Sequence, residues 1–390
     1  MIALLIILLI IVITMAVVVS FDIIPFLNDA FMRMKIGSLY GENWFDSACA
    51  AAHMWAQKGL PDVPQVAGKR FAIIDRIKGT NKSDAIQSWQ SGSVLLALDE
   101  VKSSGVEDLI SKHINLQTGE WQSFLNRVDS AFMAYAILSC EKTDIGFVKP
   151  AMEQTFEMLH NLYKNTGSIP YSKNNDYRYV DTIGLVCPFL VKYALVYDDE
   201  RALEMAVSLI KEYSEYGLHK DFNLPVHCFS SSTKAPLGIY GWGRGCGWWA
   251  IGLAESFKTL NQSKKADYTD EKVLILKNII TFADTIIRYQ NENGSFDRNV
   301  FAPSGADSSA TSMIAFLLSY IGKLSGREEY LDSAKKAMSY IYSVTRRNGV
   351  VDYSQGDTMG IGFYSQESIV LPVTQGYAIR TYIMLNIQEV

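Results

Sequence analysis

The sequence predicts an all-α protein in which six helical hairpins close into a ring, the (α/α)6 toroid, preceded by one N-terminal transmembrane helix. Three observations predict this architecture: an uncharged apolar stretch opens the chain, six apolar segments recur along the rest, and amphipathic segments alternate with them. The apolar segments start roughly 40 to 70 residues apart, a spacing typical of arrays of helix pairs. We therefore expect a transmembrane anchor or signal-like segment over 1–21, a linker over 22–40 and the toroid over 41–390.

Composition restricts the class of protein before any motif is considered. The 390 residues are 48% hydrophobic and 20% charged, an ordinary globular balance. The formal net charge is -5 and no run rich in Lys and Arg occurs, so we expect no nucleic-acid partner. Five cysteines are widely spread and none forms a Cys-x-x-Cys pair, which argues against a disulfide scaffold or a cysteine zinc site.

The N-terminal stretch is long enough to cross a membrane. Its first 21 residues carry no charged side chain and would span about 31 Å as a helix, the thickness of a bilayer core. No basic residue precedes the stretch and residues 18–20 form a poor cleavage site, which favours an uncleaved anchor over the alternative, a cleaved signal peptide. Arg33 and Lys35 follow the stretch, which favours a cytoplasmic location for the C-terminal side. The side of the membrane stays open.

Six segments are expected to form the inner helices of the ring. Each is apolar on most faces and opens with small or polar residues, as a helix buried inside a ring requires. These segments begin with residues 88–96, 128–134, 180–185, 245–250, 307–313 and 374–379.

The amphipathic segments are expected to form an outer layer, because they carry apolar residues at helical spacing with charges between them. They cover residues 46–58, 147–164, 200–216, 270–290 and 328–345. Glycine turns tend to follow the outer helices, where glycine supplies a left-handed cap. These glycines are Gly119, Gly167, Gly294 and Gly349.

The alternation of outer and inner helices has a consequence for ligands. It places the N-termini of all six inner helices on one face, where their partial positive charges favour an anionic ligand. An open α-solenoid that binds proteins would use more regular repeat lengths, so the closed ring is the favoured architecture.

Two carboxylates occupy equivalent points of consecutive hairpins. Asp129 and Asp181 each follow a valine and each opens an inner helix, so both should reach the same rim. Paired carboxylates are the usual equipment of glycoside chemistry, one as acid and the other as base or positioning group. Asp is also a common helix N-cap, which is the structural alternative for both residues.

A second candidate group surrounds the start of the fourth inner helix. Residues 241–249 contain four glycines, Arg244, Trp242, Trp248 and a further tryptophan, and His227 precedes them in a loop. Glycine lets a backbone approach a ligand closely, Arg can bind a carboxylate through two hydrogen bonds, and Trp offers a flat wall to a sugar ring. The structural alternative is tight helix packing around buried tryptophans.

Other chemistry finds little support in the sequence. The five histidines show no metal-ligand spacing, and no dinucleotide-binding, P-loop or Gly-x-Ser-x-Gly motif occurs. We therefore expect neither a metal nor a cofactor.

These residues together resemble the unsaturated glycuronyl hydrolases. The resemblance rests on Val-Asp-Thr-Ile at the start of the third inner helix (residues 180–183), on Trp-Gly-Arg-Gly-Cys-Gly-Trp (residues 242–248) after His227, and on Asp129 one hairpin earlier. The more similar group is glycoside hydrolase family 105, the unsaturated rhamnogalacturonyl hydrolases, with family 88 as its relative. The likeness covers roughly residues 40–390, and its fold is the six-hairpin glycosidase toroid.

The resemblance implies a reaction and roles for the candidate residues. Such enzymes act on oligosaccharides that carry a 4,5-unsaturated uronic acid, and they hydrate the double bond without a metal. Asp181 aligns with the general acid/base and Asp129 with a second carboxylate near the sugar. The substrate-binding positions correspond to His227, Trp242, Arg244 and Trp248, with Tyr179 standing where a tryptophan is frequent.

Three interpretations follow for the function. The leading one is a membrane-tethered glycoside hydrolase that takes an oligosaccharide with an anionic sugar. The second is another carbohydrate-active enzyme on the same toroid. The third is a non-catalytic glycan-binding member of the same fold, which would keep its ligand affinity when Asp181 is replaced by asparagine.

Overall fold

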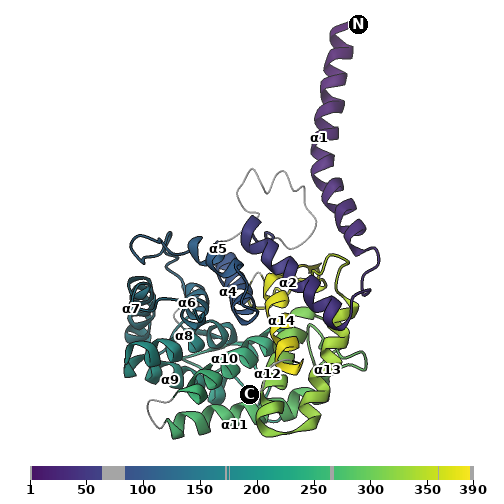
Figure 1. The fold of residues 1–390 in the computed structure, drawn as a ribbon. Coiled ribbons are helices and arrows are strands. Elements are labelled where there is room, and N and C mark those ends of the chain that lie inside the picture. The colour runs from purple at the N-terminus through teal and green to yellow at the C-terminus, as the bar shows by residue number, and fades with distance from the viewer. Residues whose placement is uncertain are drawn as a thin grey trace.

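A computed structural model of the protein describes residues 2–63, 84–171, 174, 176–263, 268–358 and 360–386. Among these residues the dominant feature is a ring of inner helices (Figure 1). Each inner helix packs on the next one along the chain, and the last packs on the first, which closes the ring. The predicted toroid is therefore confirmed. The inner helices are α4 (Asp84–Glu100), α6 (Ser130–Ser139), α8 (Val180–Tyr197), α10 (Gly243–Gln262), α12 (Ser308–Ser325) and α14 (Pro372–Asn386).

An outer layer of helices surrounds the ring. Its members alternate with the inner helices along the chain and pack against them. The predicted segments correspond to five of these helices, whereas α5, with only seven residues, is too short to give a clear periodic pattern. The outer helices are α2 (Gly41–Lys58), α5 (Gly105–Ser111), α7 (Lys149–Thr166), α9 (Glu200–Tyr216), α11 (Thr269–Ile286), which the short 3-10 helix η1 (Ile287–Tyr289) extends, and α13 (Glu328–Ser343).

The four predicted glycine turns all adopt the left-handed backbone conformation. The φ angles of Gly119, Gly167, Gly294 and Gly349 are 73°, 69°, 88° and 82°. Three of these glycines also lie against a neighbouring backbone: a Cβ on Gly349 would come within 2.1 Å of the Ser47 carbonyl oxygen. Glycine therefore serves both the turn and the close packing of one hairpin on the next.

Short strands lie in the loops that lead into the inner helices. β1 (Tyr177–Tyr179), β2 (Val226–Ser230) and β3 (Pro236–Tyr240) form an antiparallel sheet in that order. A second antiparallel pair joins β4 (Ser354–Gln355) to β5 (Ser368–Ile369). The sequence analysis did not predict these strands, which are two to five residues long and position side chains beside the helix starts.

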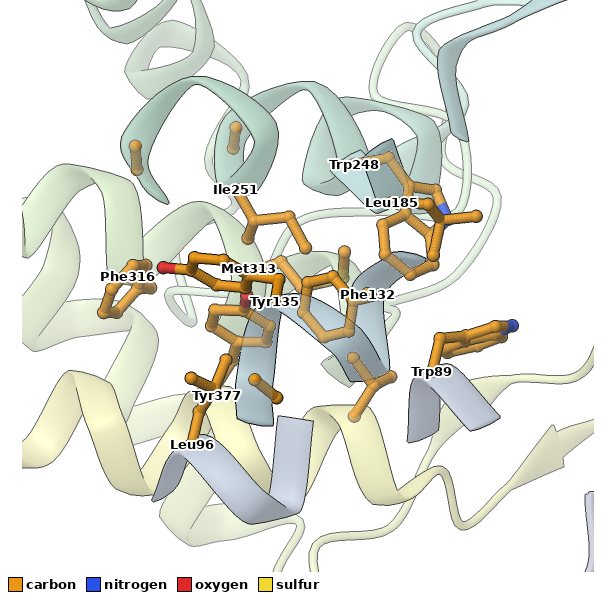
Figure 2. Close-up of a cluster of buried hydrophobic side chains, with 14 of the residues drawn as sticks. Trp89, Leu96, Phe132, Tyr135, Leu185, Trp248, Ile251, Met313, Phe316 and Tyr377 are labelled. Atoms are coloured by element: carbon orange, nitrogen blue, oxygen red, sulfur yellow. The ribbon is translucent and has the colours of Figure 1, made fainter. Parts of the chain in front are cut away.

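Large apolar side chains fill the centre of the ring (Figure 2). Trp89 of α4 and Trp248 of α10 meet edge to face, with ring centroids 5.0 Å apart. A buried charged network lies among the same helices: Arg380 contacts Glu255, and its Nε donates to Glu100 at 2.9 Å. The hydroxyl groups of Tyr135 and Tyr377 donate to Glu255 at 2.8 and 3.0 Å. These interactions join α4, α6, α10 and α14.

The N-terminal helix α1 (Ile2–Arg33) projects from the toroid (Figure 1). It continues to Arg33, so much of the segment expected as a linker over 22–40 is helical. Among the described residues, α1 and α8 are long and apolar enough to cross a membrane. Most of α8 is buried inside the toroid and serves as a core helix, whereas no part of the apolar stretch of α1 is buried.

Candidate active site

The N-terminal ends of the inner helices lie on one face of the toroid, together with the loops that precede them. We call this the front face; its loops comprise the described residues within 113–129, 167–179, 217–242, 291–307 and 345–371. Asp129 immediately precedes α6, Asp181 lies in the first turn of α8, and Arg244 lies in the first turn of α10. The fold therefore brings the predicted residues to one rim.

Asp181 is a buried carboxyl group with few partners. Its Oδ2 has no hydrogen-bond partner among the described residues and lies 3.8 Å from Nε2 of His227. The pKa of Asp181 is raised to about 7, mainly by burial; Arg244 opposes the shift, and the negative charges of Asp129 and Asp357 contribute to it. A carboxyl group with a pKa near neutrality can both donate and accept a proton at neutral pH.

Asp129 has a different environment and is more deeply buried, with its side chain 1% exposed against 16% for Asp181. The Tyr171 hydroxyl donates to its Oδ1 at 2.9 Å, and Nε of Arg127 donates to its Oδ2 at 3.1 Å. Burial raises the pKa of Tyr171 well above its usual value, so that hydroxyl stays a donor. Asp129 makes no side-chain cap of α6. Its oxygens are instead held by two donors, which suits a fixed positioning group better than a proton carrier.

Arg244 supplies a buried positive charge that acts on Asp181. It donates to the carbonyl oxygens of Gln355 and Gly356, the latter at 2.9 Å, and to the Thr358 hydroxyl at 3.1 Å. No carboxylate of the described residues forms an ion pair with it, and its electrostatic effect reaches both Asp181 and Asp357. A guanidinium held by neutral acceptors is suited to attract an anionic ligand.

Aromatic rings line the site around His227. The ring of His227 lies 4.5 Å from that of Trp242 and 5.5 Å from that of Tyr179, between centroids. Its Nδ1 is 3.0 Å from the Tyr364 hydroxyl. Burial and the charge of Arg244 lower the pKa of His227 to about 3. The imidazole is therefore neutral at neutral pH and is available for hydrogen bonding rather than for charge stabilisation.

Trp242 and Trp248 differ in their surroundings. Nε1 of Trp242 donates to Oε1 of Gln355 at 2.9 Å, which fixes its ring beside His227. Trp248, one helical turn after Arg244, packs instead against Trp89 and is 2% exposed (Figure 2). The structure places Trp248 at the boundary between site and core, and its contact with substrate stays a prediction.

The glycines of residues 241–249 serve helix packing. A Cβ on Gly243 would lie 2.2 Å from the Asp297 carbonyl oxygen, and one on Gly247 would lie 3.0 Å from Met313. The hypothesis that these glycines admit a ligand is therefore wrong for Gly243 and Gly247, because protein atoms already occupy the space. The structural alternative, tight packing of the helix start, holds for both.

Several site residues were missed by the sequence analysis because they lie in loops without a motif. Burial raises the pKa of Asp357, a third carboxyl whose charge influences that of Asp181. Turn-forming residues around 354–358 are the only signal that could have indicated this segment. The other missed residues are Arg127, Tyr171, Gln355, Thr358 and Tyr364. Within the described part of the chain, no group of three His, Cys, Asp or Glu side chains could hold a metal ion.

A ring of six hairpins with carboxyl groups and a buried arginine at its front rim is an arrangement typical of carbohydrate-active enzymes of the six-hairpin class, and the family match decides the class. The sequence model of Glycosyl Hydrolase Family 88 matches residues 75–388. The chain belongs to this family and is a glycoside hydrolase.

Solved structures share the toroid. A possible member of the GH105 family from Salmonella enterica serovar Paratyphi A is 15% identical, with a TM-score of 0.68, over 86% of this chain and 93% of that one. The unsaturated glucuronyl hydrolase from Bacillus sp. GL1 is 16% identical, with a TM-score of 0.66, over 88% and 95%. At these identities the likeness concerns the fold. None of the curated proteins matches the chain in sequence.

Proposed function

We propose that the protein hydrolyses oligosaccharides that end in a 4,5-unsaturated uronic acid, with Asp181 as general acid and base. The observation that carries this proposal is the carboxyl of Asp181, which is buried with a pKa of about 7 within the electrostatic reach of Arg244. Two of the structural neighbours are described as unsaturated glucuronyl hydrolases, one of them specific for heparin. The proposed substrate class is consistent with both.

The first step is a proton transfer to carbon. The protonated Asp181 gives its proton to C4 of the C4=C5 vinyl ether, and the π electrons of that bond form the new C–H bond. Positive charge develops on C5 and is shared with the ring oxygen. The resulting carboxylate of Asp181 stabilises this charge, so its proton is lost when a negative charge is most useful.

The second step adds water. The Asp181 carboxylate takes one proton of a water molecule whose oxygen bonds to C5, which regenerates the acid and forms a hemiketal. Opening of the hemiketal leaves a ketone at C5 and a hydroxyl at C1, and the C1 hemiacetal then releases the second sugar. One water is consumed overall, and the anomeric carbon is never attacked directly.

The surrounding residues bind and orient the sugar. We assign the substrate carboxylate to the side of the site charged by Arg244, because its guanidinium has only neutral hydrogen-bond acceptors among the described residues. Asp129, held by Tyr171, accepts hydrogen bonds from sugar hydroxyls. The neutral His227 holds a hydroxyl or the attacking water, and Tyr179 and Trp242 provide aromatic walls for the ring.

The test uses the ultraviolet absorbance of the conjugated double bond, which hydration destroys. Wild-type protein is mixed with unsaturated disaccharides from pectin and glycosaminoglycan lyase digests. We expect the absorbance to fall, and Asp181→Asn to slow the fall by about 10²–10⁴-fold, as for loss of a general acid. Asp332→Asn, at an exposed position on α13, is the matched control. Binding without absorbance loss in any digest would favour the non-catalytic interpretation instead.

We also propose that α1 is an uncleaved membrane anchor, with the toroid on the cytoplasmic side. The support is its uncharged stretch, no part of which is buried, and the basic residues that follow it. Resistance to carbonate extraction, together with an intact N-terminus in the mature protein, is the expected result. A mature chain that starts after residue 20 would contradict the anchor, because that is where a signal peptide would be removed.

A further inference from the structure

The N-terminal helix is joined to the toroid by specific contacts. Nε of Arg33 lies 2.8 Å from Oδ2 of the buried Asp352, and Nη2 of Arg346 lies 3.0 Å from Oδ1 of Asp29. The guanidinium of Arg347 stacks 3.9 Å from the ring centroid of Phe31. Contacts from three positions on α1 define its direction, which a flexible linker would leave free.

The turn after α1 is also fixed. The Gly37 N–H donates to the Thr345 carbonyl oxygen at 2.9 Å. A Cβ on Gly37, whose φ is 73°, would approach the Ser343 carbonyl oxygen to 2.8 Å. The chain therefore stays attached to the toroid beyond the helix end, and the joint comprises residues 29–37 and 343–352.

This joint lies on the front face. The Asp352 carbonyl oxygen accepts from the hydroxyl of Ser308, the first residue of α12, at 2.6 Å. Three residues further along the chain, the Gln355 carbonyl oxygen accepts from Arg244. The anchor joint and the acceptors that hold the candidate substrate-binding arginine thus belong to one short loop.

The direction of α1 turns the front face toward the side on which a membrane around α1 would lie. In Figure 1, α14 runs downward toward the C-terminus, so its N-terminal end, which belongs to the front face, lies on the upper side, and α1 rises from that side. The uncharged stretch ends at residue 21, and residues 22–33 continue the helix for about 18 Å. The headgroup region occupies roughly the first 5–8 Å of that length.

We propose that α1 holds the front face toward the bilayer, at a short distance from the headgroups, and that the site takes glycan chain ends attached to lipid in the same membrane. The gap accommodates a short oligosaccharide, whose terminal sugar enters the site while its other end stays at the surface. This proposal rests on the proposed anchor and on the proposed activity toward unsaturated uronyl sugars. It adds that the substrate is attached to lipid, which neither the anchor nor the activity determines.

The orientation is tested with the full chain in lipid vesicles by energy transfer to an acceptor lipid. Donor dyes are placed on Leu116→Cys, in a front loop, and on Lys142→Cys, in the turn that follows α6 on the opposite side. A Cys49→Ser background prevents other labelling, because the other four cysteines are buried. We expect more transfer from position 116 than from position 142. Equal or reversed transfer would overturn the orientation.

The substrate class is tested in the same vesicles. An unsaturated disaccharide linked to a lipid is compared with the same free disaccharide at equal total concentration. We expect about tenfold or faster turnover of the linked form, since co-localisation raises its effective concentration. Asp29→Ala combined with Arg33→Ala should reduce this preference, because the front face is then held less firmly toward the surface, and should leave the free rate unchanged. Lys35→Ala, at an exposed position of the joint that makes none of the contacts above, should preserve the preference.

The outcomes separate the proposals. Equal turnover of linked and free substrate by the wild-type protein overturns the lipid-linked substrate. Failure to turn over either form overturns the proposed activity and with it the substrate assignment, whereas the energy transfer still decides the orientation. Removal of α1 in the mature protein overturns the orientation itself.

Discussion

Nε2 of His227 lies 3.8 Å from Oδ2 of Asp181. At neutral pH the imidazole is uncharged and the carboxyl group is only partly ionised. Burial keeps the imidazole neutral, with a pKa of about 3, so it cannot stabilise the ionised carboxylate as a cation would. Burial gives Asp181 a pKa of about 7, so it reaches the substrate with its proton still bound in a large fraction of molecules. A single carboxyl can then act first as acid and afterwards as base.

The activity should depend on pH through Asp181. Because the first step needs the protonated carboxyl, we expect kcat/KM to fall as the pH rises through about 7, with the slope of one proton. His227 has a pKa of about 3, so its titration should not change the rate near neutral pH. Rates measured with a short unsaturated disaccharide across the pH range check this. A profile that rises through pH 7 would show that an ionised group carries out the first step.

The same pKa shift predicts an effect on stability. The folded state raises the pKa of Asp181 above its unfolded value, so between those two values the folded chain binds more protons, and its stability falls as the pH rises. Asp181→Asn removes this dependence. We expect the variant to gain stability relative to wild type as the pH increases toward 7, in denaturant titrations at several pH values. A constant difference between the two proteins would contradict the buried, proton-binding carboxyl.

Arg244 should matter for the charge of the substrate. Replacing it with methionine removes the positive charge, and we expect KM for an unsaturated uronyl disaccharide to rise about 10–100-fold, as for loss of a charged hydrogen bond. The methyl ester of the same uronate is the matched control substrate, and its KM should change little. The acid limb should also move to higher pH, because Arg244 lowers the pKa of Asp181. Equal losses for acid and ester would indicate a merely structural arginine.

The buried network around Glu255 should dominate the stability of the ring. Arg380→Met leaves Glu255 uncompensated, and we expect a loss of about 3–5 kcal/mol in the free energy of unfolding. Glu255→Gln in the same chain should recover much of that loss, because the unpaired charge is then gone. Chemical denaturation of both variants measures these values. Failure of the second substitution to restore stability would mean that packing, not charge, accounts for the loss.

Two glycine turns form a matched pair. Gly167 and Gly349 both have positive φ, but a Cβ on Gly167 would meet no atom within 4 Å, whereas one on Gly349 would collide with the Ser47 carbonyl oxygen. We expect Gly167→Ala to cost about 1–2 kcal/mol, the backbone penalty alone. Gly349→Ala should cost about 1–3 kcal/mol more through the collision. Equal losses would show that the hairpins can separate freely at this turn.

The sequence was sufficient for the repeating part of the fold. The inner helices are apolar on nearly all faces, a pattern that only burial in the ring explains, and Asp129 and Asp181 open two of them. Short elements were not predictable, since the seven residues of α5 complete only two turns. The extension of α1 to Arg33 was also missed, because its last turns are held by distant partners such as Asp352.

Site residues could be predicted where they lie at the start of an inner helix. Site residues that lie in long loops could not be predicted. Arg244 belongs to a marked cluster, but its acceptors at residues 355–358 are more than a hundred positions away. Tyr171 and Tyr364 contact Asp129 and His227 through loop geometry that no local pattern encodes. The glycines near Arg244 are an unusual feature that the sequence analysis connected with ligand binding. The structure connects them with the packing of α10 instead.

The most direct test compares two disaccharides that differ only in the C4=C5 double bond. Hydration by Asp181 requires that bond, whereas ordinary hydrolysis at the anomeric carbon does not. The account predicts that wild-type protein releases the second sugar from the unsaturated disaccharide alone, and that Asp181→Asn slows this release by about 10²–10⁴-fold. Release from the saturated disaccharide at a comparable rate would contradict the proposed reaction.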